Sequence, residues 1–415
     1  MQHKKIGPLL LSGLMIGPIL GSGIIILPPL VYAVAGNWAF PAWMLIVMVS
    51  FFFASIFGQL SLLFPGDAGV MDAVEEAFGP RVKKLASMYL LGAVLFGPVA
   101  VMLTASQYLQ LGSGIHIALI ALPILALCTW LLLQQLTSIG SFSLLISSLV
   151  VVTLFGGGIT TVFQHHQEMT ALPAFSGHNF GYALLLLFWT VVGWEVVGNY
   201  SADIQSPEKT IPRAIAFSVS IMALVSLTVA AAIQLVAPTV TQGHSVDVTA
   251  IITPLFGNTS TIVMAVLVAS LCMTSYLLFT GAVARLLASM AVEGIWFLPR
   301  TFADKSQNNA PAMAIISLTL FHAVVLVAVY FDLASIEKLV ALADGFFIAN
   351  ALTGILAAVK LLQSRILKAA SIILACIFTG ILLHASPVVV ALIVLMALYC
   401  CAYRLPAWYR SCPKN

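Results

Sequence analysis

A single carboxylate interrupts the apolar stretch LLLLFWTVVGWEVVGNY, which runs from Leu184 to Tyr200. This carboxylate, Glu195, follows Gly193 by two residues. A charged side chain at membrane depth is costly, so such groups usually face the interior of a helix bundle or a water-filled path and often carry protons or ions. We therefore expect Glu195 to bind and release a proton. The alternative is a protonated Glu195 that only holds helices together through hydrogen bonds.

A second unusual stretch, GPILGSGIIILPP, lies between Gly17 and Pro29. Gly lowers helix propensity by about 1 kcal/mol and Pro by about 3 kcal/mol, so we expect a broken helix. Unwound backbone at membrane depth is tolerated only where it is buried in protein or lines a cavity. Backbone amides at a half-helix N-terminus, here those of Gly21, Ser22 and Gly23, favour an anion such as a carboxylate. The alternative is that these glycines only permit close helix packing.

The two interruptions lie at corresponding positions, because the break at Val192 and Gly193 comes five apolar spans after the first one. Paired breaks of this kind in two halves of a chain point to a substrate site near the middle of the membrane in an inverted-repeat transporter. The sequence therefore predicts a substrate site between the two breaks.

Two further groups offer ion chemistry. Asp344, in ALADGFFIAN, is a second acid inside an apolar span and a second proton-coupling candidate, although it could instead cap a helix or pair with Lys338. Thr274 and Ser275 carry adjacent hydroxyls, which are weak candidates for sodium ligands. In a helix interior such hydroxyls more often bond back to their own backbone. No metal site and no cofactor other than a coupling ion is expected.

The composition decides the class of protein. Of 415 residues, 61% are hydrophobic and 7% are charged, with a mean hydropathy of +1.10, values far outside the range of soluble domains. We expect an all-helical, multi-pass membrane protein. Charges scattered at helix ends exclude a nucleic-acid partner. No nucleophile, base and orienting group recur at usable spacing, so we expect no enzyme.

Apolar runs of about 20 residues predict twelve membrane spans. Their approximate ranges are 7–34, 39–63, 83–111, 116–135, 139–163, 180–200, 211–236, 258–290, 311–330, 336–362, 367–384 and 387–404. An even number of spans places both termini on one side. Of the 17 Lys and Arg residues, only Lys338 falls on the opposite side, so the positive-inside rule makes both termini cytoplasmic.

Several motifs occur together in order along the chain. They are GSGIIILP in the first span, FPGDAGVMDAVEEAFG after the second, FWTVVGWE with SPEKTIPRAI around the sixth, and RLLASMAVEG at the end of the eighth. The stretch after the second span also reads as an amphipathic cytoplasmic helix, with a plain solvated connector as the alternative. Together these motifs resemble the amino acid, polyamine and organocation (APC) superfamily of secondary transporters over essentially the whole chain. Among its branches, bacterial exporters of methionine and branched-chain amino acids are the most similar.

The resemblance implies a LeuT-type fold of two inverted five-helix repeats, 1–163 and 180–362, in which helices 1 and 6 are broken. Two further helices follow at 367–404. The family's substrate-binding positions correspond to Gly21, Ser22, Gly23, Ile24, Val192 and Gly193, its gating aromatic to Trp189 and its acid to Glu195. An aromatic that shapes the side-chain pocket corresponds to Phe279. One Gly of the PxxGG pattern is Ala68 here, and the acid before the NPxR pattern appears as Asp203. The fifth span lacks the proton-carrying Lys of some members.

These observations predict an alternating-access carrier of apolar amino acids in the bacterial cytoplasmic membrane, working as a proton-coupled exporter or exchanger. Gly92, Ala93 and Gly97 in the third span, with Phe279, would form small or apolar pocket walls. Two alternatives remain: a sodium-coupled importer, and a membrane sensor that binds amino acids without transporting them. The protein is expected to work as a monomer or homodimer.

Overall fold

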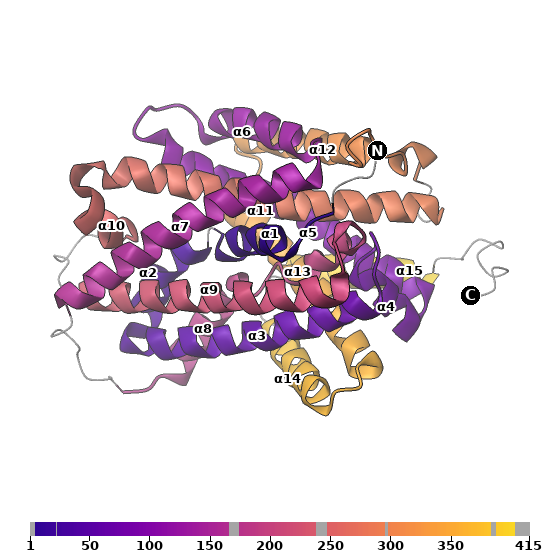
Figure 1. The fold of residues 1–415 in the computed structure, drawn as a ribbon, viewed down its shortest axis with the longest axis horizontal. Helices are drawn as coiled ribbons and strands as arrows, with labels where there is room; N and C mark the ends of the chain where they lie inside the picture. Colours follow the sequence, from indigo (N-terminus) through magenta and orange to yellow (C-terminus); the bar gives the residue numbers. More distant parts are fainter. Residues whose placement is uncertain are drawn as a thin grey trace.

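The structure is a computed structural model that describes residues 5–21, 23–165, 174–237, 247–294, 298–382 and 387–402. Helices form nearly all of it, and the bundle is elongated along the direction in which most of them run (Figure 1). In the described residues the only strand-like pairing is an isolated parallel bridge between Ile6 and Ile204. The expectation of an all-helical chain is therefore confirmed for this part of the sequence.

Each of the twelve predicted spans has a helical counterpart. The helices are α1 (Pro8–Leu20), α2 (Gly23–Ala35), α3 (Ala39–Leu63), α5 (Pro80–Gln110), α6 (Ile117–Leu132), α7 (Leu136–His165), α8 (Gly177–Leu187), α9 (Pro207–Val236), α11 (Ser260–Val292), α12 (Ala312–Tyr330), α13 (Ile336–Leu361), α14 (Arg365–Leu382) and α15 (Pro387–Ala402). Nine helical stretches of the described residues are long and apolar enough to cross a membrane, and one of these, Pro8–Leu63, contains two predicted spans. The shorter apolar helices α6 and α15 bring the total to twelve.

Both expected helix breaks are present. α1 ends at Leu20 and α2 begins at Gly23, with Gly21 between them at a φ of 45°. α8 ends at Leu187, and the chain then passes through Gly193 at a φ of 125°, a conformation that L side chains rarely adopt. Beyond this break the chain does not resume an α-helix. It continues as the 3₁₀ helix η3 (Glu195–Asp203). In a 3₁₀ helix the backbone hydrogen bonds join residues three apart rather than four apart.

Two short helices flank the spans. The amphipathic helix expected after the second span is confirmed as α4 (Val70–Phe78), which buries Val70, Val74 and Ala77 and turns its acids outward. α10 (Thr249–Phe256) was not predicted, since the connection between spans seven and eight read as a loop. It packs against α7 and α11.

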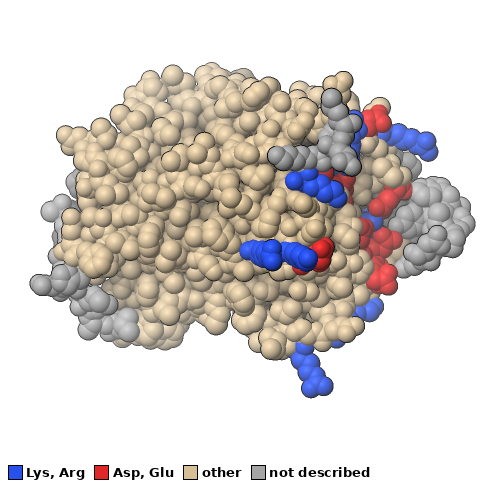
Figure 2. Space-filling model, viewed as in Figure 1, with Lys and Arg blue, Asp and Glu red and all other residues tan. Residues whose placement is uncertain are grey.

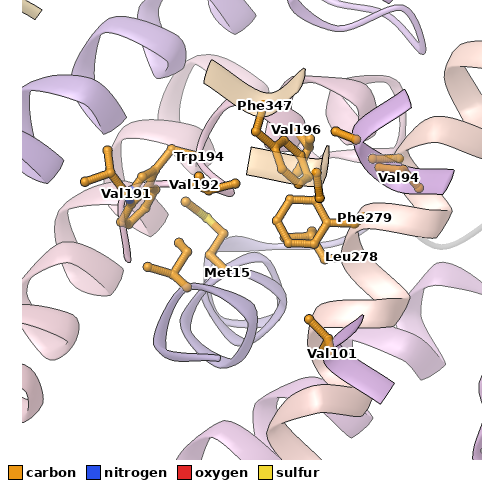
Figure 3. Packing of buried hydrophobic residues seen from close by; sticks show 14 of the residues in the cluster. Met15, Val94, Val101, Val191, Val192, Trp194, Val196, Leu278, Phe279 and Phe347 are labelled. Atoms are coloured by element: carbon orange, nitrogen blue, oxygen red, sulfur yellow. The ribbon is translucent and has the colours of Figure 1, made fainter. Parts of the chain in front are cut away.

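Helix α5 lies at the centre of the helix packing. It packs along both α13 and α11, while α1 lies against α7, α9 and α11. These close approaches depend on small residues: a Cβ added at Gly92 would lie 3.0 Å from the Phe346 ring of α13. Buried hydrophobic side chains from α1, α5, α11, α13 and the break after α8 pack against one another (Figure 3).

Charged side chains gather at one end of the bundle, which we call the charged end (Figure 2). The start of α5, with Lys83, and the last turn of α13, with Lys360, lie at this end, where Lys360 donates to the Ala77 carbonyl of α4. Helix α13 runs away from the opposite end, where it starts at Ile336. The charge asymmetry expected from the sequence is thus present in the fold.

Candidate functional site

A small cavity, called here the central cavity, lies between the two helix breaks. Its volume is about 20 Å³. It is lined by Pro18, Gly21, Gly97, Pro98, Val101, Trp189, Val192, Ser275, Phe279 and Phe347. A cavity of this size holds about one water molecule, so no amino acid fits in this conformation. Any substrate that binds here must displace the side chains that fill the space.

The central cavity brings together five of the positions predicted for substrate binding: Gly21, Gly97, Trp189, Val192 and Phe279. They come from α1, α5, α11 and the break after α8, which are far apart in sequence. Figure 3 shows Val192, Phe279 and Phe347 next to one another, and the Phe279 and Phe347 ring centroids are 5.1 Å apart. The wall opposite the two breaks is thus aromatic.

A much larger space, called here the vestibule, opens from the opposite end of the bundle. It measures about 660 Å³ and is bounded by α2, the second half of α5, α8 and the first half of α13. Most of its lining is apolar, including Ile26, Leu30 and Leu186. A pocket of several hundred cubic ångströms accommodates a small organic molecule. The vestibule is therefore large enough for an amino acid.

Trp189 lies between the two spaces, because it lines both the vestibule and the central cavity. Its indole is half-buried, and a Cβ added at Gly23 would lie 3.2 Å from the Trp189 Cδ1 atom. The side chain is held where a molecule passing from the vestibule to the central cavity would meet it. This is the position that a gate requires.

The remaining predicted positions of the first break are distributed differently. Gly23 lines the vestibule, and Ile24 is buried without lining either space. Ser22 lies outside the described residues. The Gly21 amide donates to the Gly17 carbonyl at 2.7 Å, so it ends α1 and is not open to a ligand, contrary to the expectation for this group. The first-turn amides of α2, which begins at Gly23, have no partner within their own helix.

The three residues of the third span that were predicted to form pocket walls also lie in different surroundings. Gly97 lines the central cavity, but Gly92 and Ala93 do not. Gly92 packs against the Phe346 ring and borders a groove between α5 and α15, and Ala93 is fully buried. Residues five apart lie on different faces of a helix, which explains why Gly97 lines the cavity and Gly92 does not. Ala93, one turn before Gly97, is instead buried in helix packing.

Glu195 caps the break that precedes it. The Gly193 amide donates to Glu195 Oε2 at 2.9 Å, and the residue is 3% exposed. Its second oxygen, Oε1, is buried and has no hydrogen-bond partner in the described residues. Glu195 does not line the central cavity, although it follows the cavity-lining Val192 by three residues. Its carboxyl group therefore acts on the geometry of the break rather than on the cavity surface.

Asp344 lies on α13 and lines the vestibule together with Glu337. Its Oδ1 atom is buried and has no hydrogen-bond partner among the described residues. Lys338 is exposed, and the structure records no ion pair between it and Asp344 within the described ranges. Pairing with Lys338, one of the two alternatives for Asp344, is thus not observed.

The hydroxyls considered for sodium are engaged with backbone. Thr274 Oγ1 donates to the Leu271 carbonyl at 2.7 Å. Ser275 Oγ lies 3.2 Å from the Leu271 carbonyl and 3.5 Å from that of Pro18. No cluster of metal-binding His, Cys, Asp and Glu residues occurs in the described part of the chain. The back-bonding alternative therefore describes both hydroxyls as they stand.

The charged end is closed beneath the central cavity. Asp203 accepts from Arg285 at 3.4 Å and from Asn309 Nδ2 at 3.0 Å, and the Arg285 guanidinium lies 4.5 Å from the centre of the Tyr200 ring. The Ile6 amide also donates to the Asp203 carbonyl at 3.0 Å. These contacts join η3, α11 and the segment before α1. In this conformation the central cavity is closed at the charged end and lies below an open vestibule.

Sequence reasoning missed four residues of the central cavity: Pro18, Pro98, Val101 and Phe347. Two signals could have found the prolines, because Pro18 lies within the Gly-rich first span and Pro98 directly follows Gly97. Phe347 lies one helical turn after Asp344 on α13. Val101 looks like any other apolar residue of α5, and only packing against the other helices distinguishes it.

Two broken helices that meet at a buried cavity, within a bundle of membrane-spanning helices, define a membrane transport protein. Residues 6–410 match the amino acid permease family, and the chain belongs to this family. It is therefore a transporter and not an enzyme, and amino acids are the class of substrate that the family implies. The matched region includes both breaks and every residue that lines the central cavity.

The chain is similar to two curated proteins. It is 27% identical over 353 residues to the L-methionine/branched-chain amino acid exporter YjeH of Escherichia coli (strain K12). The matched region covers 81% of each chain. It is 24% identical over 203 residues to the uncharacterized amino acid permease YecA of Bacillus subtilis (strain 168), covering 48% of this chain and 47% of that protein. The predicted resemblance to amino acid transporters is thus confirmed.

Proposed function

We propose that this permease moves apolar amino acids of the methionine, leucine, isoleucine and valine class across the membrane by alternating access. The observation that carries the proposal is the lining of the central cavity, which contains no Lys, Arg, Asp or Glu among the described residues. A basic or acidic substrate side chain would be buried there without a partner, which is costly. An aliphatic or thioether side chain would instead pack against Phe279, Phe347 and Val101.

The backbone groups of the substrate would be held at the first break. α2 begins at Gly23, beside the central cavity, and the N-terminus of a helix attracts a carboxylate through its amides and its dipole. Ser275 Oγ and the Pro18 carbonyl lie on the same side of the cavity and supply hydrogen-bonding groups for the substrate ammonium. This arrangement orients the amino acid and leaves its side chain toward the aromatic wall.

The conformation described here supports the alternating part of the proposal. An open vestibule on one side and a closed charged end on the other are what one state of an alternating-access carrier requires. By the positive-inside rule the charged end and both termini are cytoplasmic, so the vestibule faces outward. In this proposal the chain is a bacterial inner-membrane protein in which 1–163 and 180–362 are the two inverted repeats and 367–404 adds two helices.

We propose that the coupling ion is a proton and that net transport is export or exchange. Glu195 Oε1 and Asp344 Oδ1 are buried carboxyl oxygens without hydrogen-bond partners among the described residues, and they supply the groups that would bind it. Direction rests on similarity alone, since the relative with 81% coverage is named as an exporter. Sodium coupling is disfavoured because Thr274 and Ser275 make the back-bonds that helix hydroxyls ordinarily make, and only Ser275 of the two lines the central cavity.

The test uses purified protein in liposomes loaded with labelled amino acids. We expect efflux and exchange of methionine and leucine, inhibition of that flux by unlabelled isoleucine and valine, and no flux of arginine or lysine. A proton gradient should drive net flux equally well in sodium-free buffer. Transport of basic amino acids alone would refute the substrate class, a strict need for sodium would refute the coupling, and binding without flux would identify a sensor.

A further inference from the structure

Pro98 leaves one backbone carbonyl of α5 without its helical partner. In an α-helix the carbonyl of residue i accepts from the amide of residue i+4, and proline has no amide hydrogen. Pro98 lies inside α5, so the Val94 carbonyl receives no bond from position 98. Val94 is fully buried, where an unpaired carbonyl is costly. Another donor is therefore needed at this point.

His322 of α12 supplies that donor. Its Nε2 atom lies 2.9 Å from the Val94 carbonyl oxygen, and the side chain is fully buried. A carbonyl only accepts, so the ring hydrogen must be on Nε2. Nδ1 is then an acceptor, and the Tyr276 hydroxyl of α11, 2.9 Å away, donates to it. The imidazole thus joins α5, α11 and α12 with both nitrogens satisfied.

This contact connects two walls of the central cavity. On α5, the cavity-lining residues Gly97 and Pro98 follow Val94 within about one turn. On α11, the cavity-lining residues Ser275 and Phe279 flank Tyr276. His322 itself lines neither the central cavity nor the vestibule. It therefore acts on the cavity only through the two helices that it holds.

We propose that His322 is a positioning residue for the substrate site. It replaces the hydrogen bond that Pro98 removes from α5, and with Tyr276 it fixes the part of α5 around Pro98 at a set distance from α11. The width of the central cavity between Gly97 and Phe279 depends on that distance. An apolar side chain of similar volume would fill the same space but would leave the Val94 carbonyl without its donor and remove the acceptor that Nδ1 offers to the Tyr276 hydroxyl.

The first test is a stability cycle that needs no substrate. His322→Leu should lower the unfolding temperature of the purified protein by about 2–4 °C, because one buried carbonyl loses its donor. Pro98→Ala returns an amide hydrogen to the helix, so His322→Leu should cost clearly less in the Pro98→Ala background. Pro123→Ala in α6 is the matched control, since Pro123 also lies inside a helix but is exposed. The hydrogen bonds recorded for His322 go to Val94 and Tyr276 instead. Equal costs in all three backgrounds would overturn the proposal.

The second test asks whether the contact sets the substrate site, and it rests on the proposed function. The apparent affinity for methionine is measured by ligand-dependent thermal shift. His322→Gln keeps an N–H donor and should retain an affinity close to that of the wild type, while His322→Leu and Tyr276→Phe should weaken it, His322→Leu by about tenfold. Unchanged affinity in a folded His322→Leu protein would overturn the positioning role. If the wild type binds no apolar amino acid, the proposed function fails and the stability cycle alone decides this inference.

Discussion

The Gly193 amide and the Glu195 carboxylate form a hydrogen bond of 2.9 Å across the break of the sixth span. Gly193 has a φ of 125°, which takes its backbone out of the helix, and the carboxylate two residues later accepts the amide that the helix no longer pairs. The acid proposed to carry the proton and the unwound backbone beside the proposed substrate site are therefore directly linked. A change of protonation at Glu195 would alter the strength of this bond and thus the stability of the break.

We expect Glu195→Gln to retain substrate binding but to lose the pH dependence of transport. Glutamine keeps an oxygen that accepts from Gly193 but cannot release a proton. Net flux, which requires proton movement in the proposed mechanism, should slow more than amino acid exchange. The measurement is the pH profile of both modes in liposomes. A Glu195→Gln protein with the wild-type pH profile would show that Glu195 only caps the break, and Asp344→Asn would then be the next variant to examine.

Trp189→Ala should damage transport more than folding. The indole is half-buried between the vestibule and the central cavity, so its loss opens the path without emptying the core. Trp194→Ala is the matched control. Trp194 is 2% exposed and its Nε1 donates to Ser50 at 2.9 Å, so we expect a loss of about 3–5 kcal/mol in the free energy of unfolding.

Thermal unfolding in detergent and initial transport rates together separate the two tryptophans. A Trp189→Ala protein that unfolds as readily as Trp194→Ala would remove the support for a gate at this position.

Asp203→Asn should favour conformations that are open at the charged end. It removes the charge that pairs with Arg285, whose side chain is 7% exposed, while keeping an acceptor for Asn309. A partly exposed pair of this kind contributes about 1 kcal/mol, so we expect a cysteine at Val192 to react about fivefold faster with an impermeant maleimide from the charged side. The native cysteines are replaced in this background. Asp67→Asn, which removes a pair with Lys305 instead, is the comparison.

If the labelling rate at Val192 were the same in the parent and in Asp203→Asn, the Arg285–Asp203 contact would not hold the charged end closed. Labelling from the vestibule side provides the internal check, because it should fall when the charged end opens.

Lys83→Met should destabilise the protein far more than Lys84→Met. Lys83 is 2% exposed and forms ion pairs of 2.8–2.9 Å with Asp72, Glu75 and Glu293, which join α4, α5 and the end of α11. Its removal leaves three carboxylates without their cation. Because these acids are 22–35% exposed, we expect a cost of about 2–3 kcal/mol, below that for a fully buried pair.

Lys84 is equally buried, and its Nζ lies 4.8 Å from the centre of the Tyr399 ring. At this position the methionine side chain can replace the apolar stem of the lysine. Unfolding temperatures of the two variants provide the measurement. Similar losses in both would mean that the acids at this end are held by other contacts.

The sequence by itself determined the membrane class, the twelve spans and the two breaks. Each of these depends on interactions within a few residues: an apolar run must be long enough to cross the bilayer, and glycine and proline at Gly17–Pro29 and at Gly193 weaken the helix wherever they occur. The distribution of Lys and Arg among the loops can likewise be read directly from the sequence. Local rules therefore indicated the position of the proposed substrate site.

Only the tertiary structure decided which residues meet there. Gly92 and Gly97 look alike in the sequence, but the rotation of α5 against α13 turns Gly97 toward the central cavity and Gly92 toward Phe346. Glu195 looks like a cavity residue, yet its carboxylate turns back to Gly193. His322 gives no signal beyond one imidazole in an apolar helix, because its role depends on a carbonyl 228 residues away that Pro98 has left without its helical donor. Helix rotation and partners distant in sequence are set by packing, which local patterns do not encode.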